Sequence, residues 1–304
     1  MNNTVYGLNN NFKQVTTKYD ESHEALWTFM NQKNTIPCFN GQIVEELTQH
    51  HAEIAKTGGL LHHNGNTHNI RYSIAASLTP NVFNLGGQLS LIRELALNRQ
   101  RDALKSYAVK ALDVLATRTF KFNIPTLTTI SLLQGQTLGA GLEAALTSDV
   151  VIAERKTMIG FPEIMFNLFP GMGAYSLVAR KAGTKVADDM ILGGKLYTAE
   201  QAHELGLIDV LVEDGEGESA VYNWISGNKK LSNGYRAIQK AKARFNPVTY
   251  AELLDITYIW LDAALTLSER DFKVMERFIR SQEKLYVTSE QSDTNVVEIL
   301  RSVG

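Results

Sequence analysis

Two glutamates stand twenty positions apart in the 304-residue chain, each beside glycines that bend the backbone close to a helical pattern. Glu143 belongs to the segment GQTLGAGLEAAL, and Glu163 belongs to FPEIMFNLFPGMG. Two carboxyls can work as acid and base together when one stays protonated while the other stays ionised. A glycine bend at a helix N-terminus also leaves backbone N–H groups free to stabilise negative charge. The pair therefore predicts proton transfer with a developing oxyanion.

The surroundings of Glu143 strengthen this prediction. Its neighbours in the sequence are leucines and alanines, so a helix here would hold the carboxylate close to apolar surface and raise its pKa. A buried carboxyl is costly without a function. A single glutamate beside a glycine bend is usually a capping or solvated residue, and the prediction depends on two sites that share one design.

Composition narrows the class of protein. The 30 basic and 32 acidic residues give a formal charge of -2, so we expect neither nucleic acid nor a membrane as partner, although a local basic patch could meet an acidic carrier. Cys38 is the only cysteine, which excludes an intramolecular disulfide and argues against a cysteine metal cluster. The N-terminus lacks a signal-peptide pattern and no apolar run could span a membrane, so we expect a cytoplasmic protein.

Two other segments have residues typical of a dinucleotide-binding motif and of a metal site. The segment GMGAYS at 171–176 has serine in place of the last glycine of a dinucleotide fingerprint. No predicted strand beside it carries an acidic residue at the position that the fingerprint requires, so we predict no cofactor. Histidines occur at positions 50, 51, 62, 63 and 68, but the last three flank the turn signal Asn64-Gly65-Asn66. We therefore predict a surface hairpin in this region and no metal site.

Strand and helix patterns alternate along most of the chain, which predicts an α/β fold. Asn40 and Thr198 are predicted helix N-caps, and one long helical pattern covers roughly residues 89–120. Strand signals stop near residue 230, and helical patterns follow. We predict an N-terminal arm with short strands over 1–37, a core over 38–230 and a helical region over 231–304.

Three segments, VFNLGGQL, LQGQTLGAGLEAALTSDVVIAE and GFPEIMFNLFPGMG, resemble the crotonase (enoyl-CoA hydratase/isomerase) superfamily in their order and spacing, over roughly residues 38–245. The resemblance implies a spiral of β-β-α repeats with a helical C-terminal layer. It also implies that Glu143 and Glu163 are the two catalytic glutamates, and that the backbone N–H groups of Leu85 and Ala140 are the oxyanion donors. The family commonly has glycine at the second donor position, but alanine can serve if its φ angle is negative.

The remaining predicted site residues form the substrate pocket. We expect the substrate to lie against the glycines of both bends, with two aromatic side chains of the C-terminal region as walls of an acyl-chain pocket. The predicted substrate-binding residues are Gly86, Gly87, Gly139, Gly141, Trp260 and Phe278.

Within the superfamily, FNLFPGMGAYS, the N-terminal arm and the tail ITYIWLDAALTLSERDFKVMERFIR most resemble diffusible signal factor synthases, which make cis-2-unsaturated fatty acids for bacterial quorum sensing. This implies an oligomer, often a trimer, that dehydrates a 3-hydroxyacyl thioester of acyl carrier protein and then cleaves the thioester. It also implies that a cognate sensor kinase can bind. Gln88 replaces a usual aspartate and AYSLV replaces a GTQRL-like run, which weakens the case for ordinary coenzyme A hydration. A conventional enoyl-CoA hydratase or isomerase, or a non-catalytic regulatory binder, are the alternatives.

Overall fold

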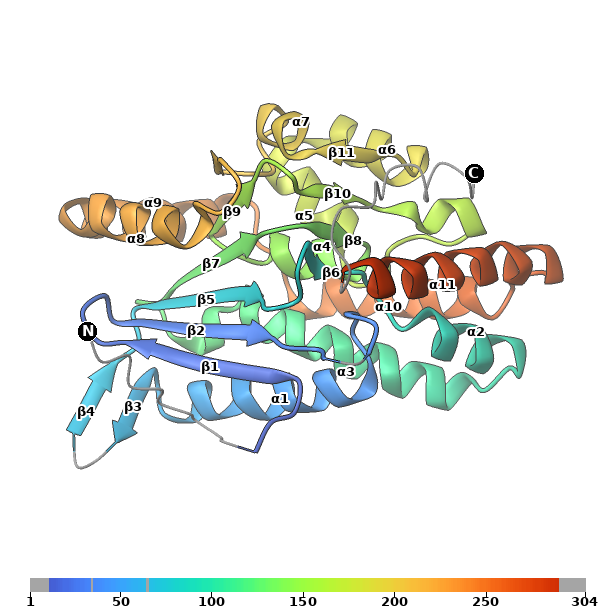
Figure 1. Ribbon diagram of the computed structural model, residues 1–304, viewed down its shortest axis with the longest axis horizontal. Coiled ribbons are helices and arrows are strands. Elements are labelled where there is room, and N and C mark those ends of the chain that lie inside the picture. Colours follow the sequence, from blue (N-terminus) through green and yellow to red (C-terminus); the bar gives the residue numbers. More distant parts are fainter. Residues whose placement is uncertain (1–10, 34, 64–65, 290–304) are drawn as a thin grey trace.

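The computed structural model describes residues 11–33, 35–63 and 66–289, and Figure 1 shows how their helices and strands are arranged. The first ten residues and Asn34 of the predicted arm, the turn residues Asn64 and Gly65, and the last fifteen residues of the predicted helical region lie outside the described residues.

The larger sheet has six strands in the order β1-β2-β5-β7-β9-β12. β1 and β2 are antiparallel, and every other neighbouring pair is parallel. The central strands are buried along their whole length, as expected for parallel strands covered on both faces. The strands are β1 (Val15–Asp20), β2 (Ala25–Met30), β5 (Tyr72–Ser77), β7 (Thr128–Leu133), β9 (Val150–Glu154) and β12 (Val210–Val212).

A second sheet has four strands in the order β11-β10-β8-β6. They are β6 (Val82–Asn84), β8 (Gln136–Leu138), β10 (Met158–Gly160) and β11 (Leu196–Thr198). Along the chain, β5 is followed by β6, β7 by β8 and β9 by β10, so each unit gives one strand to each sheet before a helical segment begins. This order confirms the predicted α/β spiral of β-β-α repeats.

Helices cover both faces of the larger sheet. α1 (Gly41–Lys56) and α3 (Arg101–Thr119) pack together, while the apolar residues of α8 (Gly217–Asn228) join a cluster that contains β2, β5, β7 and β9. Asn40 caps α1, because its side chain accepts a hydrogen bond of 3.0 Å from the Ile43 N–H. Thr198 and Gln201 form a capping box at α7 (Ala199–Glu204). Both predicted N-caps are confirmed.

The long helix predicted over 89–120 is wrong in one respect. The structure divides it into α2 (Leu89–Leu97) and α3, and Arg99 between them has a left-handed φ of 52°. Because the residue with this left-handed φ is not a glycine, the sequence contains no glycine that would indicate the end of the first helix.

The C-terminal region is helical, as predicted, and consists of α9 (Ser232–Phe245), α10 (Tyr250–Ala264) and α11 (Glu269–Ser289). α10 packs on α3 and α11 packs on α2, whereas α9 lies apart from them, near α8 in the view of Figure 1. Shorter elements complete the fold: α4 (Ala140–Leu146), α5 (Ala174–Ala182), α6 (Thr184–Gly193), η1 (Lys121–Asn123), η2 (Pro162–Phe166) and η3 (Lys229–Leu231).

The histidine-rich segment forms the predicted hairpin. β3 (Leu60–His63) and β4 (Asn66–Asn69) pair antiparallel, whereas His50 and His51 are buried in α1. In the part of the chain that the structure describes, no group of three or more histidine, cysteine or acidic side chains could hold a metal ion. Within the same residues, no helix is both long and apolar enough to cross a membrane.

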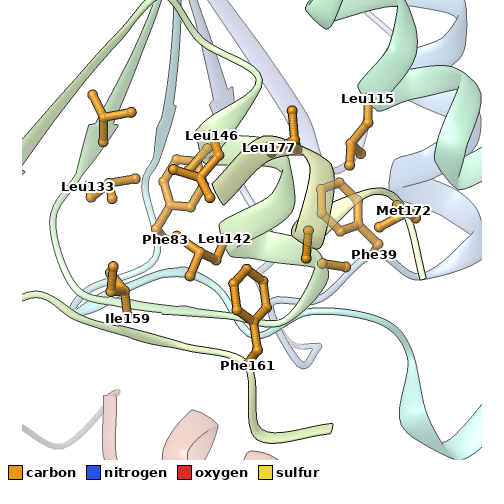
Figure 2. Packing of buried hydrophobic residues seen from close by; sticks show 14 of the residues in the cluster. Phe39, Phe83, Leu115, Leu133, Leu142, Leu146, Ile159, Phe161, Met172 and Leu177 are labelled. Carbon is orange, nitrogen blue, oxygen red and sulfur yellow. The ribbon is translucent and has the colours of Figure 1, made fainter. Parts of the chain in front are cut away.

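The strands of the predicted N-terminal arm belong to the main sheet. β2 is buried throughout and pairs in parallel with β5, from Ala25 opposite Tyr72 to Met30 opposite Ser77. Met30 also belongs to the hydrophobic core around α4, part of which is shown in Figure 2. The arm is therefore an edge of the larger sheet and contributes to the core.

Candidate active site

The short helix α4 positions Glu143. Leu142 and Leu146 of this helix are buried with Phe83 and Phe161 (Figure 2), which fixes the helix against the core. Glu143 is only 1% exposed, yet it lines a pocket. The leucines of α4 thus pack in the core, and the carboxyl of Glu143 on the same helix lies at a cavity.

Backbone N–H groups hold the Glu143 carboxylate. Its Oε1 atom accepts hydrogen bonds of 2.7 Å from Met172 N and 2.9 Å from Ala174 N, at the glycine bend that begins α5. Gly173 has a φ of 105° there, which favours glycine. Burial raises the pKa of Glu143 to about 7, and the two backbone hydrogen bonds act in the opposite direction.

Glu163 reaches the same pocket from η2. Its Oε1 atom lies so close to Gly139 that a Cβ atom on this glycine would be 2.2 Å away. Its Oε2 atom is buried and has no hydrogen-bond partner among the described residues. Burial and, to a smaller extent, the negative charge of Glu143 together raise the pKa of Glu163 to about 8.

The structure therefore brings the two predicted glutamates together in one cavity. Because each carboxyl influences the other, they titrate as a coupled pair. Loss of the first proton leaves one carboxylate and one carboxylic acid, a state that can accept one proton and donate another. The raised pKa values make this state accessible near neutral pH.

The prediction that Leu85 is an oxyanion donor is wrong. Its N–H donates a hydrogen bond of 2.8 Å to the carbonyl oxygen of Pro37, so it is already engaged in the fold. Two residues later, Gly87 lines the pocket, and no hydrogen bond among the described residues uses its N–H. Gly87 was predicted only as a substrate contact, but it is the residue of this bend with an available donor.

Ala140 meets the conditions for the second donor. It lines the pocket as the first residue of α4, where an N–H has no partner within the helix, and its φ is not positive. The Gly86 bend packs close to it, because a Cβ atom on Gly86 would lie 3.4 Å from Ala140 N and 3.0 Å from the Leu138 carbonyl oxygen. Gly86 has a φ of 95°. The two bends are therefore neighbours.

The pocket contains about 570 Å³ of space, including the part open to solvent. Apart from the two carboxyls, its walls are mainly apolar. The walls come from the segment before α1, the first glycine bend, α2, α3, α4, the segment 163–172 and α10. The lining residues are Phe39, Gly87, Leu89, Ile92, Tyr107, Ala108, Ala111, Ala140, Glu143, Glu163, Phe166, Leu168, Phe169, Pro170, Gly171, Met172 and Trp260. An apolar chain fits such a lining.

Not every predicted substrate contact lies in the wall. Trp260 does, but Phe278 packs behind it, with its ring 5.3 Å from that of Phe166. Of the four glycines, only Gly87 lines the pocket. Gly141 instead permits close packing, since a Cβ atom there would lie 2.4 Å from the Asn84 carbonyl oxygen.

Sequence reasoning missed Tyr107 and Gln282, both of which contact the first glycine bend. The Tyr107 hydroxyl accepts a hydrogen bond of 2.9 Å from Gln88 N, and the Gln282 amide donates one of 2.9 Å to the Leu85 carbonyl oxygen. Each continues the apolar face of its helix, since Tyr107 follows the buried Leu104 by three positions and Gln282 follows the buried Ile279 by three, and this spacing is the one signal in the sequence.

Comparison with known proteins identifies the family. The family model for enoyl-CoA hydratase/isomerase matches residues 39–277, which is most of the chain. The protein therefore belongs to the enoyl-CoA hydratase/isomerase family. Among curated relatives, 2,3-dehydroadipyl-CoA hydratase of Escherichia coli strain K12 is 39% identical over 114 residues, which are 37% of this chain and 44% of that protein.

A second relative, the alpha subunit of the fatty acid oxidation complex of Vibrio cholerae, is 28% identical over 206 residues, or 67% of this chain and 27% of that protein. The chain thus spans less than half the length of both relatives. Among solved structures, an enoyl-CoA hydratase from Bacillus halodurans superposes with a TM-score of 0.70 at 20% identity, covering 87% of this chain and 99% of that one. DspI of Pseudomonas aeruginosa gives 0.60 at 20% identity, covering 90% and 96%. The fold is crotonase-like.

Proposed function

We propose that this protein dehydrates a 3-hydroxyacyl thioester of acyl carrier protein and then hydrolyses the thioester, releasing a free cis-2-unsaturated fatty acid that serves as a quorum-sensing signal. The observation that carries the acid/base part is the pair Glu143 and Glu163, buried at one apolar pocket with raised pKa values. The carrier and the product are supported by the sequence resemblance to diffusible signal factor synthases.

Formation of an enolate is the difficult step, because removal of a C2 proton places negative charge on the thioester oxygen. In our proposal the N–H groups of Gly87 and Ala140 donate to this oxygen. Both residues line the pocket and neither N–H is engaged elsewhere among the described residues. A single fixed donor of this kind is typically worth about 3 kcal/mol of barrier.

Proton transfer is the task of the carboxyl pair. One carboxylate takes the C2 proton, and the other carboxyl gives a proton to the 3-hydroxyl, which leaves as water while the double bond forms. General acid assistance is needed because hydroxide is a poor leaving group, and it contributes roughly a hundredfold or more. One proton enters the pair and one leaves it, so the pair keeps its total number of protons, and the proton now lies on the carboxyl that acted as the base.

Thioester cleavage uses the same groups. A carboxylate of the pair takes a proton from water, the water oxygen bonds to the thioester carbonyl carbon, and the two N–H donors hold the tetrahedral oxyanion. The carbon–sulfur bond then breaks, the carboxyl that took the proton returns it to the departing thiolate, and the products are a carboxylic acid and the carrier thiol. This step requires a water molecule near the carbonyl carbon after dehydration.

The decisive experiment incubates the protein with 3-hydroxyacyl carrier proteins of several chain lengths and follows both products by mass spectrometry. We expect dehydration followed by a free unsaturated acid. Glu143→Gln and Glu163→Gln keep the shape of the side chains but remove the proton function, so each should lower turnover by about a hundredfold or more. Dehydration by both variants at the wild-type rate would contradict the assignment of the pair.

A conventional enoyl-CoA hydratase or isomerase is the second candidate, because the family match covers most of the chain. It predicts a coenzyme A thioester as the final product. Parallel reactions with coenzyme A and carrier-protein substrates separate the two candidates. An intact unsaturated thioester with no free acid would favour the hydratase.

A further inference from the structure

The first glycine bend is held from several sides by hydrogen bonds. The Gly86 carbonyl oxygen accepts from Phe39 N at 2.8 Å, and Gly86 N donates to Asn84 Oδ1 at 2.8 Å. On the C-terminal side, Gln282 of α11 donates to the Leu85 carbonyl oxygen at 2.9 Å. These contacts secure residues 85 and 86, which precede Gly87.

Tyr107 of α3 secures the other side of Gly87. Its hydroxyl donates a hydrogen bond of 2.6 Å to the Phe39 carbonyl oxygen and accepts one of 2.9 Å from Gln88 N. The hydroxyl is also close to Gly87 itself, because a Cβ atom there would lie 3.5 Å away. Tyr107 therefore links the residue after Gly87 to the strand-like segment that enters α1.

These hydrogen bonds exclude a role as proton donor. A phenol has one proton, and the Tyr107 proton is already given to Phe39. Burial also raises the pKa of the phenol, so it does not act as a base near neutral pH. Tyr107 lines the pocket, but its hydroxyl faces the backbone of the bend.

We propose that the Tyr107 hydroxyl is a positioning group, which fixes the Gly87 N–H in the direction that the enolate oxygen requires. The inference rests on the proposed function, in which Gly87 is an oxyanion donor. Gly86 and Gly87 are adjacent glycines, and glycine has the largest backbone freedom of any residue. A shift of about 1 Å in a catalytic group can cost roughly a hundredfold in rate. An anchor on both sides of Gly87 prevents such a shift.

The test is Tyr107→Phe, which keeps the ring and removes both hydrogen bonds. The readout is exchange of the C2 protons of octanoyl-CoA for deuterium in D₂O, followed by NMR, because this exchange needs enolate formation alone. We expect the exchange kcat to fall by about tenfold to a hundredfold, with KM changed by less than about threefold. A purely structural role would lower the melting temperature without this division between kcat and KM.

Tyr250→Phe is the matched control. Tyr250 of α10 donates its hydroxyl hydrogen bond to Asp113 Oδ1 of α3 at 2.7 Å, so this variant also removes a tyrosine contact to α3, but not one to the bend. Its exchange rate should equal that of the wild type. Equal rates for Tyr107→Phe and the wild type, or equal losses in both variants, would overturn the inference.

The exchange assay also separates this inference from the proposed function. A wild type that exchanges C2 protons but never releases a free acid refutes the proposed product, while the comparison of Tyr107→Phe with the wild type still decides the role of the hydroxyl. A wild type that exchanges no C2 protons with any acyl thioester refutes both.

Discussion

The carboxyl group of Glu163 lies directly against Gly139, where a Cβ atom would come within 2.2 Å of its Oε1 atom. Gly139 also has a φ of 51° and precedes Ala140, whose N–H is one of the two proposed oxyanion donors. One glycine therefore permits both the bend that exposes this donor and the close approach of a carboxyl. The acid/base group and the oxyanion donor are adjacent because position 139 carries no side chain.

Gly139→Ala should damage activity far more than stability. The added methyl group must displace Glu163, and a displaced catalytic group can cost roughly a hundredfold in kcat. Gly183→Ala is the control, because Gly183 also has a positive φ, of 92°, but a Cβ atom there meets nothing within 4 Å. Both variants should lose about 1–3 kcal/mol of stability from backbone strain. Chemical denaturation and dehydration assays measure the two effects, and equal activity of both variants would contradict this account.

The pH dependence of kcat/KM should be bell-shaped, with its maximum between about pH 7 and 8. Below this window both carboxyls of Glu143 and Glu163 are protonated, so no base is present; above it both are ionised, so no acid is present. Rates across pH 5.5–9.5 with one substrate test the profile. A flat profile over that range would show that the pair does not limit the reaction.

Glu163→Gln should stabilise the fold at alkaline pH. The pKa of Glu163 is raised in the folded protein to about 8 from an ordinary value of 4.5, so between these values the folded state binds more protons than the unfolded state. Stability therefore falls as pH rises through this window, and the loss is complete above the folded pKa. We expect the variant to exceed the wild type by about 1–3 kcal/mol at pH 8.5 and by almost nothing at pH 4.5. Urea denaturation at both pH values measures this, and an equal difference at each would contradict it.

Features that depend on local sequence were predictable. Asn40 and Thr198 cap helices through side-chain contacts to residues three positions later, and the alternation of strands and helices gave the fold class. The break between helices α2 and α3 was not predictable. Arg99 adopts a left-handed conformation there, and arginine is not a residue type that indicates this conformation.

Which backbone N–H groups are available as donors in the site depends on contacts between residues that are distant in the sequence. The resemblance to the crotonase superfamily implied Leu85 as a donor, but the carbonyl of Pro37, distant in the sequence, accepts its N–H. Likewise, β2 pairs with β5 across a long separation, so an arm in the sequence became part of the main sheet. Local patterns identify which segments form the site, and only tertiary packing shows which N–H groups remain available.

Substitutions of Trp260 and Phe278 should have different effects, although both residues were expected to contact the acyl chain. Trp260 lines the pocket and packs against Gly171, whereas Phe278 contacts Phe166 from outside the wall. Trp260→Leu enlarges the pocket and adds apolar contact for longer chains, so we expect kcat/KM for long chains relative to short ones to rise by about tenfold. Phe278→Leu should cost about 1–3 kcal/mol of stability and leave this ratio unchanged. Thioesters with 8 to 14 carbon atoms measure the ratio. A shift in Phe278→Leu equal to that in Trp260→Leu would mean that the acyl chain reaches beyond the wall formed by Phe166.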